Sequence, residues 1–340
     1  MGKKIIVSII CITYNHEKYI EKCLKGLIMQ KTLFDYEILI HEDASTDKTA
    51  EIIKKYEKKY SNLIKVIYQK ENQFSQGKSP SKYLYDMAQG KYLAFCEGDD
   101  YWIDENKLQK QVTFLEDNRN YSAVYSNVLI VDENNKIFND KKARQSFPLY
   151  DNFVEKKCLK TQMSLLGQLS GMVCINFWKI FSENYKKEFL KCKVNGDVKI
   201  YLLLNHLGNI YFSKEITSCY RRTYTGSSWN ARTLNRNMSE YFYNAHIELA
   251  YFLNKVFNFK MDLKTYLLDD LCSALFYFIK NPTRENLKIF YNLYKKNETN
   301  IFQFSYFFIR KVLKKLKLIK SNNNRPLYKG KINLKGKRNL

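Results

Sequence analysis

The 340-residue sequence lacks long hydrophobic runs, Cys-x-x-Cys pairs and any abundance of histidine. No stretch reaches the roughly 18 consecutive apolar residues that a membrane-spanning helix needs, so we expect a protein that is soluble or peripheral to a membrane. Most of the eight cysteines lie inside apolar runs, where cysteine behaves as a small hydrophobic residue. Together with only four histidines, this pattern argues against a zinc site and indicates a reducing, cytoplasmic compartment.

Two phosphate-binding motifs are also absent. The sequence has neither a GxxxxGK[ST] loop nor a GxGxxG loop, which counts against nucleoside triphosphate and dinucleotide chemistry. No nucleic-acid-binding motif is present either, although the net charge is +23. About a dozen Lys and Arg residues, with no Asp or Glu, lie between Arg310 and the C-terminus. Because the first hundred residues are nearly balanced in charge, we assign the excess to a C-terminal appendage and expect no nucleic acid partner.

Short apolar runs alternate with amphipathic segments through the first hundred residues. The runs predicted to be buried strands are 5–13, 36–43, 63–69 and 91–97, and the predicted helices are 17–30, 47–60 and 79–89. This alternation predicts an α/β fold with a doubly wound, mostly parallel sheet. Ligands bind such sheets at the carboxyl ends of their strands.

The pattern changes after residue 118. We expect a hairpin over 122–138, a helix over 198–208 that ends at Gly208, and a strand over 209–222. From about residue 236 onward the pattern is mostly helical and rich in aromatic residues.

An acidic cluster follows the fourth apolar run. It consists of three carboxylates around one glycine: Glu97, Gly98, Asp99 and Asp100. Mg²⁺ and Mn²⁺ take oxygen ligands, commonly one or two carboxylates together with substrate phosphates. The cluster therefore predicts a divalent metal site that stabilises a departing diphosphate. The alternative is a solvated acidic turn before the next helix, with Asp104 as its N-cap.

A second acidic strand end lies at Glu42 and Asp43. A carboxylate in an ordered pocket accepts a hydrogen bond from the N3–H of uracil or thymine, while an aromatic residue such as Tyr14 stacks on the base. Asp43 as an ordinary turn residue is the alternative. Because the strand ends meet at one edge of the sheet, we expect the two acidic groups to belong to one site.

Three segments together resemble glycosyltransferase family 2. They are VSIICITYNHEKYIEKCLKGLIMQ, YEILIHEDASTDKT and GKYLAFCEGDDYW, the last followed by KLQKQVTFLE. The resemblance spans about residues 5–118 and continues more thinly to about residue 229. It implies the GT-A fold, a Rossmann-like doubly wound mixed sheet, and inverting transfer of a sugar from a nucleotide-sugar donor such as a UDP-sugar.

The resemblance also implies roles for individual residues. The nucleotide would be held by Tyr14, Asp43, Ser45 and Asp99. Glu97-Gly98-Asp99 stands where the family has its DXD motif, with Glu97 in place of the first Asp, so that Mn²⁺ or Mg²⁺ would bind Glu97, Asp99 or Asp100. Asn72 and Lys82 fall where contacts with the donor phosphate or sugar are plausible.

The family's general base has a counterpart in residues 195–212, where Gly-Asp precedes a helix. Asp197 would take the proton from the acceptor hydroxyl as that oxygen attacks the anomeric carbon. An ordinary carboxylate, with a pKa of about 4, is already ionised at neutral pH. The alternative is that Asp197 only caps its helix.

Many relatives carry a histidine in the loop that corresponds to residues 220–229, and this sequence has none there. A third metal ligand from this loop is therefore in doubt. Arg221 or Arg222 would instead reach the diphosphate, and Gly226 would let the loop close as a lid.

The expected domains are a catalytic domain over 1–230 and a helical C-terminal region over 231–340. The catalytic domain divides into a nucleotide-sugar half (1–118) and an acceptor half (119–230). The basic amphipathic pattern predicts contact with an anionic membrane surface through residues 301–340. That contact would hold the protein on the inner face of the cell membrane, near a glycan or lipid-linked acceptor. A solubilising tail with a packing helix is the alternative.

Two rival functions remain open. A nucleotidyltransferase or phosphohydrolase on a similar sheet would attack phosphorus rather than carbon. A nucleic-acid-binding or other anion-binding protein would use the basic tail, but acidic strand ends would repel phosphates in the absence of a metal. The Lys-, Asn-, Ile- and Tyr-rich composition suggests a low-GC bacterium and, by extension, surface polysaccharide synthesis. The sugar, the acceptor and the linkage are not predicted.

Overall fold

The computed structural model describes residues 4–137, 149–156, 167–223, 237–297 and 300–315. They form two compact units. The first contains the residues up to Lys186 together with Ile200–Arg222, and the second contains Lys187–Lys199 together with the residues from Thr223 onward. The expected domain boundary at residue 230 lies outside the described residues. In the described part of the chain, no helix combines the length and apolar composition needed to cross a membrane.

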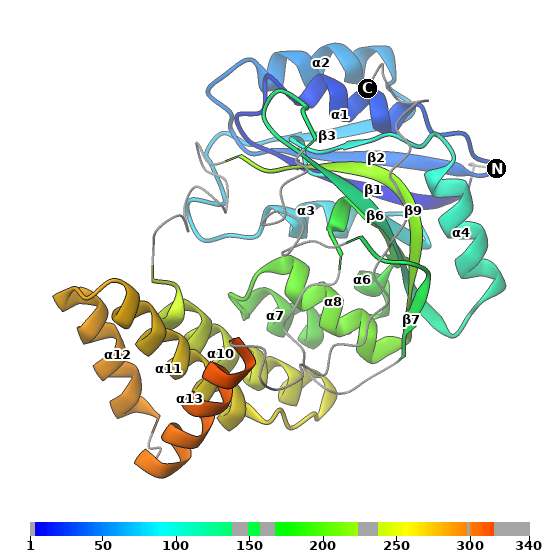
Figure 1. Cartoon of the computed structure of the whole chain (residues 1–340). Coiled ribbons are helices and arrows are strands. Elements are labelled where there is room, and N and C mark those ends of the chain that lie inside the picture. The colour runs from blue at the N-terminus through cyan, green and yellow to red at the C-terminus, as the bar shows by residue number, and fades with distance from the viewer. Residues whose placement is uncertain (1–3, 138–148, 157–166, 224–236, 298–299, 316–340) are drawn as a thin grey trace. The chain divides into compact units, whose positions relative to one another are not determined.

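The first unit is built on one mixed sheet (Figure 1). Its strands are β1 (Ile5–Thr13), β2 (Asp35–Glu42), β3 (Ile64–Tyr68), β4 (Tyr92–Phe95), β5 (Tyr101–Trp102), β6 (Tyr121–Val131), β7 (Phe153–Glu155), β8 (Met172–Ile175) and β9 (Asn209–Arg221). They lie in the order β3-β2-β1-β4-β8-β6-β9-β5, and β7 pairs with β9. Strands β3, β2, β1 and β4 run parallel to one another, whereas β8 is antiparallel to both β4 and β6.

The helices connect and cover these strands. They are α1 (Ile20–Ile28), α2 (Thr49–Lys59), α3 (Pro80–Met87), α4 (Lys107–Asp117) and α6 (Phe177–Ile180), with a 3₁₀ turn at Leu169–Gly171. Two further helices, α7 (Glu183–Lys191) and α8 (Gly196–Leu207), have residues in both units. The chain moves outward from β1 to β3 and then returns to β4. Because parallel crossovers are right-handed, this reversal places α1 and α2 on one face of the sheet and α3 on the other (Figure 1).

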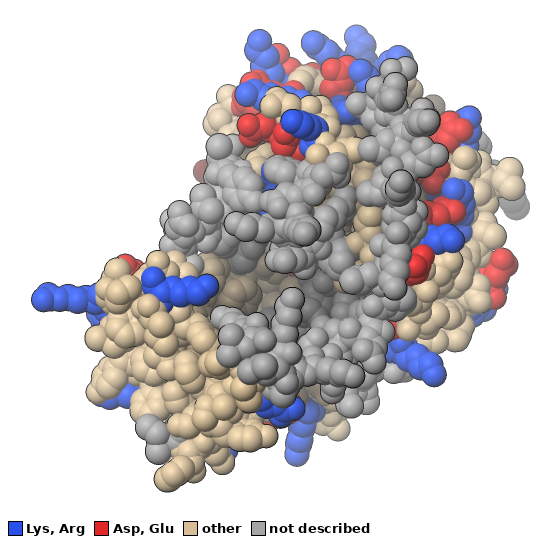
Figure 2. Space-filling view, in the orientation of Figure 1, with Lys and Arg blue, Asp and Glu red and all other residues tan. Residues whose placement is uncertain are grey.

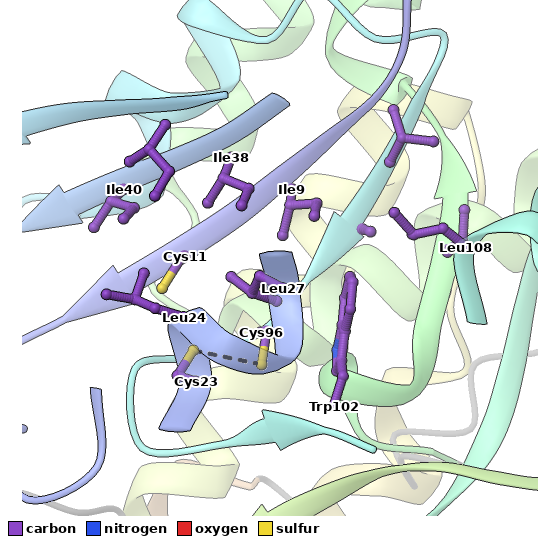
Figure 3. Close-up of a cluster of buried hydrophobic side chains, with 14 of the residues drawn as sticks. Ile9, Cys11, Cys23, Leu24, Leu27, Ile38, Ile40, Cys96, Trp102 and Leu108 are labelled. Atoms are coloured by element: carbon purple, nitrogen blue, oxygen red, sulfur yellow. Dashed lines mark hydrogen bonds between the residues drawn. The ribbon is translucent and has the colours of Figure 1, made fainter. Parts of the chain in front are cut away.

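The core of the first unit lies between β1, β2, β4 and the helix α1 (Figure 3). Figure 3 shows Ile9 and Cys11 of β1 meeting Leu24 and Leu27 of α1, with none of these four side chains exposed. Each fully buried Leu or Ile contributes about 1.5–3 kcal/mol relative to an exposed one. The thiol of Cys23 lies 3.8 Å from the sulfur of Cys96. Every cysteine that the structure describes is buried, as expected from its apolar sequence context.

The predicted α/β fold is confirmed, including the four strands and three helices of the first hundred residues. Pro80 occupies the first turn of α3, where its missing N–H leaves no unsatisfied donor. The hairpin expected over 122–138 is present with a short second arm: β6 forms the first arm, Asp132 N donates to Lys136 O across the turn, and an antiparallel bridge joins Val131 to Ile137. The long first arm also pairs with β8 and β9 in the sheet, which the sequence pattern did not indicate.

The second unit contains α10 (Ser239–Phe257), α11 (Leu263–Lys280), α12 (Arg284–Lys296) and α13 (Ile301–Lys315). Its core consists of the buried residues Tyr243, Leu271, Cys272, Ala274, Leu293 and Phe304. Two helices begin at side-chain caps, because Asp262 accepts a hydrogen bond from Thr265 N and Thr283 accepts one from Asn286 N. The helical character expected after residue 236 is confirmed for the described residues.

Candidate functional site

Three parallel strands, β1, β2 and β4, end at the same edge of the sheet. Backbone hydrogen bonds join the segments that follow them: Asp43 N donates to Thr13 O at 3.0 Å, and Gly98 N donates to Ile12 O at 2.9 Å. The predicted nucleotide residues after β1 and β2 and the acidic loop 97–100 after β4 are therefore neighbours. This is the edge at which doubly wound sheets bind ligands.

The loops after β1 and β2 are bound tightly to each other. Asn15 N donates to Ser45 Oγ at 3.0 Å, and Thr46 N donates to Asn15 Oδ1 at 2.8 Å. Asn15 and Ala44 both adopt a positive φ, of 54° and 60°, which costs energy for residues other than glycine. Ser45 thus supports the loop that carries Tyr14, whose side chain is partly exposed.

Asp43 is only 1% exposed, and its carboxylate is used within the protein. Oδ1 accepts a hydrogen bond from Gln73 N at 2.8 Å, and Oδ2 accepts one from Phe74 N at 3.1 Å. The side-chain amide of Asn72 donates to Asp43 O at 3.0 Å. Asp43 and Asn72 therefore shape the loop after β3, and their contacts with a nucleotide stay a prediction.

The acidic loop presents its carboxylates at different depths. Glu97 is exposed, Asp99 is partly exposed, and Asp100 is 5% exposed. Gly98 is required because a Cβ at this position would lie 2.4 Å from Thr13 Oγ1. Asp100 Oδ1 accepts a hydrogen bond from Arg221 N at 2.8 Å. Burial and the neighbouring Asp99 carboxylate raise the pKa of Asp100.

Arg221, predicted to contact the diphosphate, makes several hydrogen bonds within the protein. Its Nε donates to Asp99 O at 2.9 Å, Nη1 donates to Asp132 O at 2.5 Å, and Nη2 donates to Asn135 Oδ1 at 2.8 Å. The guanidinium also lies 4.2 Å from the centre of the Tyr19 ring. With 2% exposure, Arg221 clamps the acidic loop from β9, and its contact with the diphosphate stays a prediction.

The other predicted cations are placed differently. Lys82 is exposed on α3, and its Nζ lies 2.5 Å from Asp86 Oδ2, one helical turn away. Arg222 is partly exposed and donates its backbone N–H to Val131 O. Gly226 and the proposed lid loop lie outside the described residues. The roles of Lys82 and Arg222 stay predictions.

Asp197 belongs to the second unit, in the first turn of α8. Its Oδ1 accepts a hydrogen bond from Val198 N at 2.8 Å, and its side chain is partly exposed. Desolvation raises its pKa above the ordinary value assumed from the sequence. A raised pKa makes the carboxylate a stronger base. Lys199 stabilises this turn by donating to Phe189 O at 2.8 Å and Cys192 O at 2.6 Å.

The carboxylates of the acidic loop suit a divalent cation that also binds the substrate. Among the described residues, no three His, Cys, Asp or Glu side chains form a group able to hold a metal ion. Asp100 directs one oxygen to Arg221 N, whereas Asp99 is partly exposed. One or two carboxylates with diphosphate oxygens are the usual donor set for Mg²⁺. Asp99, with Glu97 two residues before it in the same loop, fits that set.

Comparison with protein families gives one match that covers more than half of the chain. The family model described as "Glycosyl transferase family 2" matches residues 8–189. An uncharacterized protein of Mycobacterium tuberculosis is 39% identical over 127 residues, which are 37% of this chain and 36% of that protein. A poly(ribitol-phosphate) beta-glucosyltransferase of Bacillus spizizenii is 35% identical over 114 residues, 33% of this chain and 18% of that enzyme. The chain thus spans well under half the length of these curated relatives.

A solved structure resembles the chain over almost its whole length. The crystal structure of S. aureus TarS residues 1–349, in complex with UDP-GlcNAc, aligns with a TM-score of 0.54 at 16% sequence identity. The alignment covers 96% of this chain and 99% of that one. At this identity the likeness concerns the fold, including the mixed sheet and the helical C-terminal region.

Proposed function

The chain belongs to glycosyltransferase family 2, and from this premise we propose that it transfers a sugar from a UDP-sugar to a hydroxyl group of a glycan or lipid-linked acceptor, with inversion of the anomeric centre. The observation that carries the proposal is the meeting of three strand ends at one sheet edge. There the acidic loop 97–100 lies beside the segments that carry Tyr14 and Asp43.

The donor's nucleotide is bound, in this proposal, by the loops after β1 and β2. Tyr14 is partly exposed and stacks on the base, while Asp43, Ser45 and Asn72 hold the surrounding backbone in place. Asp99 contacts the ribose or the diphosphate. The TarS structure is a complex with UDP-GlcNAc, which suggests a uridine donor for this chain without identifying the sugar.

Asp99 and Glu97 would hold a Mn²⁺ or Mg²⁺ ion at the diphosphate, as the resemblance implies. Such an ion neutralises the charge that develops on the leaving UDP. Arg221 keeps the Asp99 backbone fixed through its 2.9 Å hydrogen bond, so the position of the Asp99 carboxylate is set before the donor arrives.

Asp197 is the proposed general base. Its carboxylate takes the proton from the acceptor hydroxyl while that oxygen forms a bond to the anomeric carbon. The bond between this carbon and the diphosphate oxygen breaks on the opposite side, which inverts the centre. The raised pKa of Asp197 favours this role, because a more basic carboxylate accepts a proton more readily.

The acceptor class follows from the relatives by analogy only. One relative is named for glucosyl transfer to poly(ribitol-phosphate), and another is named as a putative glycosyltransferase of teichuronic acid biosynthesis. We therefore include synthesis of a bacterial surface polysaccharide in the proposal, at the inner face of the cell membrane and with contact through residues 301–340. The catalytic domain is taken as 1–230 and the helical region as 231–340. The rival nucleotidyltransferase, phosphohydrolase and anion-binding functions are not favoured by any feature of the site.

The first test is calorimetric titration of the whole chain with UDP-sugars, in the presence and absence of Mn²⁺. We expect metal-dependent binding that Asp99→Asn weakens by about tenfold or more, because a charged ligand of the metal is lost. Asp117→Asn, an exposed change at the end of α4, serves as the control and should bind normally.

Asp100→Ala distinguishes the two acids. Because it removes the buried acceptor of the Arg221 N–H hydrogen bond, this change should lower the melting temperature, which Asp99→Asn should leave nearly unchanged. A wild-type protein that binds no UDP-sugar with metal present, or Asp99→Asn that binds as well as the wild type, would overturn the proposed donor site.

A further inference from the structure

The outward face of α13 exposes three large apolar side chains in a row. Phe302 is 82% exposed, Tyr306 is 62% exposed and Ile309 is 56% exposed. Their spacing of four and three residues puts them on one face of the helix. We refer to Phe302, Tyr306 and Ile309 as the α13 face. Single exposed apolar residues are common on proteins, but an aligned set on one helix marks an interaction surface.

The opposite side of α13 is anchored in the second unit, so the α13 face points away from the core. Phe304 is 8% exposed, and the Phe308 ring stacks on the Phe276 ring at 4.8 Å. Lys311 Nζ lies 2.7 Å from both Asp269 Oδ1 and Ser273 Oγ on α11. Burying the α13 face internally would require breaking these contacts.

Positive charge lies next to the α13 face. A groove of about 460 Å³ between α13 and the start of α11 is lined by Phe302, Tyr306 and Lys264. Asp262 also lines the groove and balances the charge of Lys264, so the excess of positive charge comes from Arg310 onward. From Arg310 to the C-terminus the sequence holds about a dozen basic residues and no acidic ones. Figure 2 shows a mostly uncharged surface over α12 and α13, with Lys and Arg at its edges.

Exposed apolar side chains together with positive charge distinguish two possible anionic partners, a polyanionic glycan and an anionic bilayer. A polyanionic glycan in water would be attracted by the basic residues but would gain little from Phe302 or Ile309. The interface of an anionic bilayer accommodates both the apolar and the basic residues. Apolar side chains enter the boundary of the acyl chains, while Lys and Arg contact the headgroups.

We propose that the α13 face is a membrane-docking surface for bilayers rich in anionic lipid. Phe302, Tyr306 and Ile309 enter the interface, and the exposed Arg310 that follows Ile309 contacts the headgroups. The inference rests on the proposed function in one respect: a lipid-linked acceptor would lie at the same membrane.

The test is flotation of the full chain with vesicles of phosphatidylcholine, alone or with about 30% phosphatidylglycerol. We expect binding to the anionic vesicles that weakens as salt is raised. The triple variant Phe302→Ser, Tyr306→Ser, Ile309→Ser should bind about tenfold less, since it loses the apolar contacts and keeps the charge. Circular dichroism checks that the variant is folded, as expected for changes at exposed positions.

A matched pair of single variants serves as the control. Ile309→Ser should weaken vesicle binding, whereas Leu33→Ser, at a 95% exposed position in the first unit, should not. Solution binding of UDP-sugar, measured without vesicles, should be the same in the triple variant and the wild type. If the wild type bound no UDP-sugar, the proposed function would be wrong. Vesicle binding by the same protein would still support membrane docking through the α13 face.

Three results would overturn the α13 face as a membrane surface. The first is vesicle binding by the triple variant that equals that of the wild type. The second is that the triple variant loses binding to soluble polyphosphate to the same degree as binding to vesicles, which would indicate a site for a soluble anionic polymer. The third is that the wild type is a dimer in light scattering and binds no vesicles, while the triple variant is a monomer. That result would indicate that the α13 face is a contact between two copies of the chain.

Discussion

At the scale of single residues, Arg221 connects the last strand of the sheet to the acidic loop. A guanidinium is planar and carries five N–H donors in a fixed arrangement, which matches the three acceptors on Asp99, Asp132 and Asn135. The Tyr19 ring covers the guanidinium at 4.2 Å. A lysine at this position would offer a single ammonium group and could not reach all three acceptors.

We therefore expect Arg221→Lys to destabilise the protein by about 1–3 kcal/mol, because buried acceptors lose their donors. Donor affinity should fall as well, since the Asp99 backbone is no longer held. Urea unfolding measures the first effect and calorimetry the second. Arg119→Lys, at an 83% exposed side chain, is the matched control and should change stability by less than about 0.5 kcal/mol. Equal stability of Arg221→Lys and the wild type would contradict the clamp.

At the scale of elements, the helix α1 packs directly against the backbone of β5. Gly26 permits this approach, because a Cβ there would lie 2.7 Å from Trp102 O and 2.9 Å from Trp102 N. The strand β5 begins at Tyr101, immediately after the acidic loop. The distance between α1 and β5 therefore influences where the acidic loop lies.

Gly26→Ala tests this packing with two opposing effects. Alanine favours a helix by about 1 kcal/mol over glycine, so a change that met no neighbour would stabilise the protein. Here the contact is with backbone, and overpacking of this kind costs about 1–3 kcal/mol. We expect net destabilisation in urea unfolding and weaker UDP-sugar binding.

The adjacent change Lys25→Ala is the comparison, at a side chain that is 65% exposed on the same helix. It should alter stability by no more than about 0.5 kcal/mol. A gain in stability for Gly26→Ala would show that β5 moves freely and that α1 does not position the acidic loop.

At the scale of the whole molecule, the residues proposed for the donor and the proposed base belong to different units. Tyr14, Asp43 and Asp99 lie in the first unit, and Asp197 lies in the second. We therefore test donor binding and proton abstraction with separate variants.

Asp197→Asn should lower kcat by about 10²–10⁴-fold, because the amide cannot accept the acceptor's proton. Its affinity for UDP-sugar should equal that of the wild type, and calorimetry checks this. In the wild type, activity should fall as the pH drops through the Asp197 pKa, since only the ionised carboxylate is a base. Because burial raises that pKa, the loss should begin at higher pH than for an ordinary aspartate near 3.9.

Asp117→Asn is again the control for the loss of one charge and should transfer sugar at the wild-type rate. Transfer by Asp197→Asn at that rate would exclude Asp197 as the base. A parallel loss of donor affinity would instead assign Asp197 to donor binding or to the stability of the second unit.

The local pattern of residues was enough to predict much of this protein. The strands and helices of the first hundred residues follow from hydrophobic periodicity, which acts within a few neighbouring residues. The meeting of Asp43 with the acidic loop followed from topology, because parallel strands end at one edge. Membership of glycosyltransferase family 2 was also indicated by the order and spacing of these segments, and the family model agrees. The C-terminal excess of charge is a property of composition alone.

The tertiary structure decided how individual polar groups are used. Arg221 meets Asp99 across 122 positions of sequence, and no local pattern indicates that contact. Lys107 looks like a surface residue in the sequence, yet it is fully buried over Trp102, and desolvation lowers its pKa to about 7. Asp197 was expected to titrate normally, but burial raises its pKa. Hydrogen-bond partners and desolvation depend on residues far apart in the chain, which only the folded structure brings together.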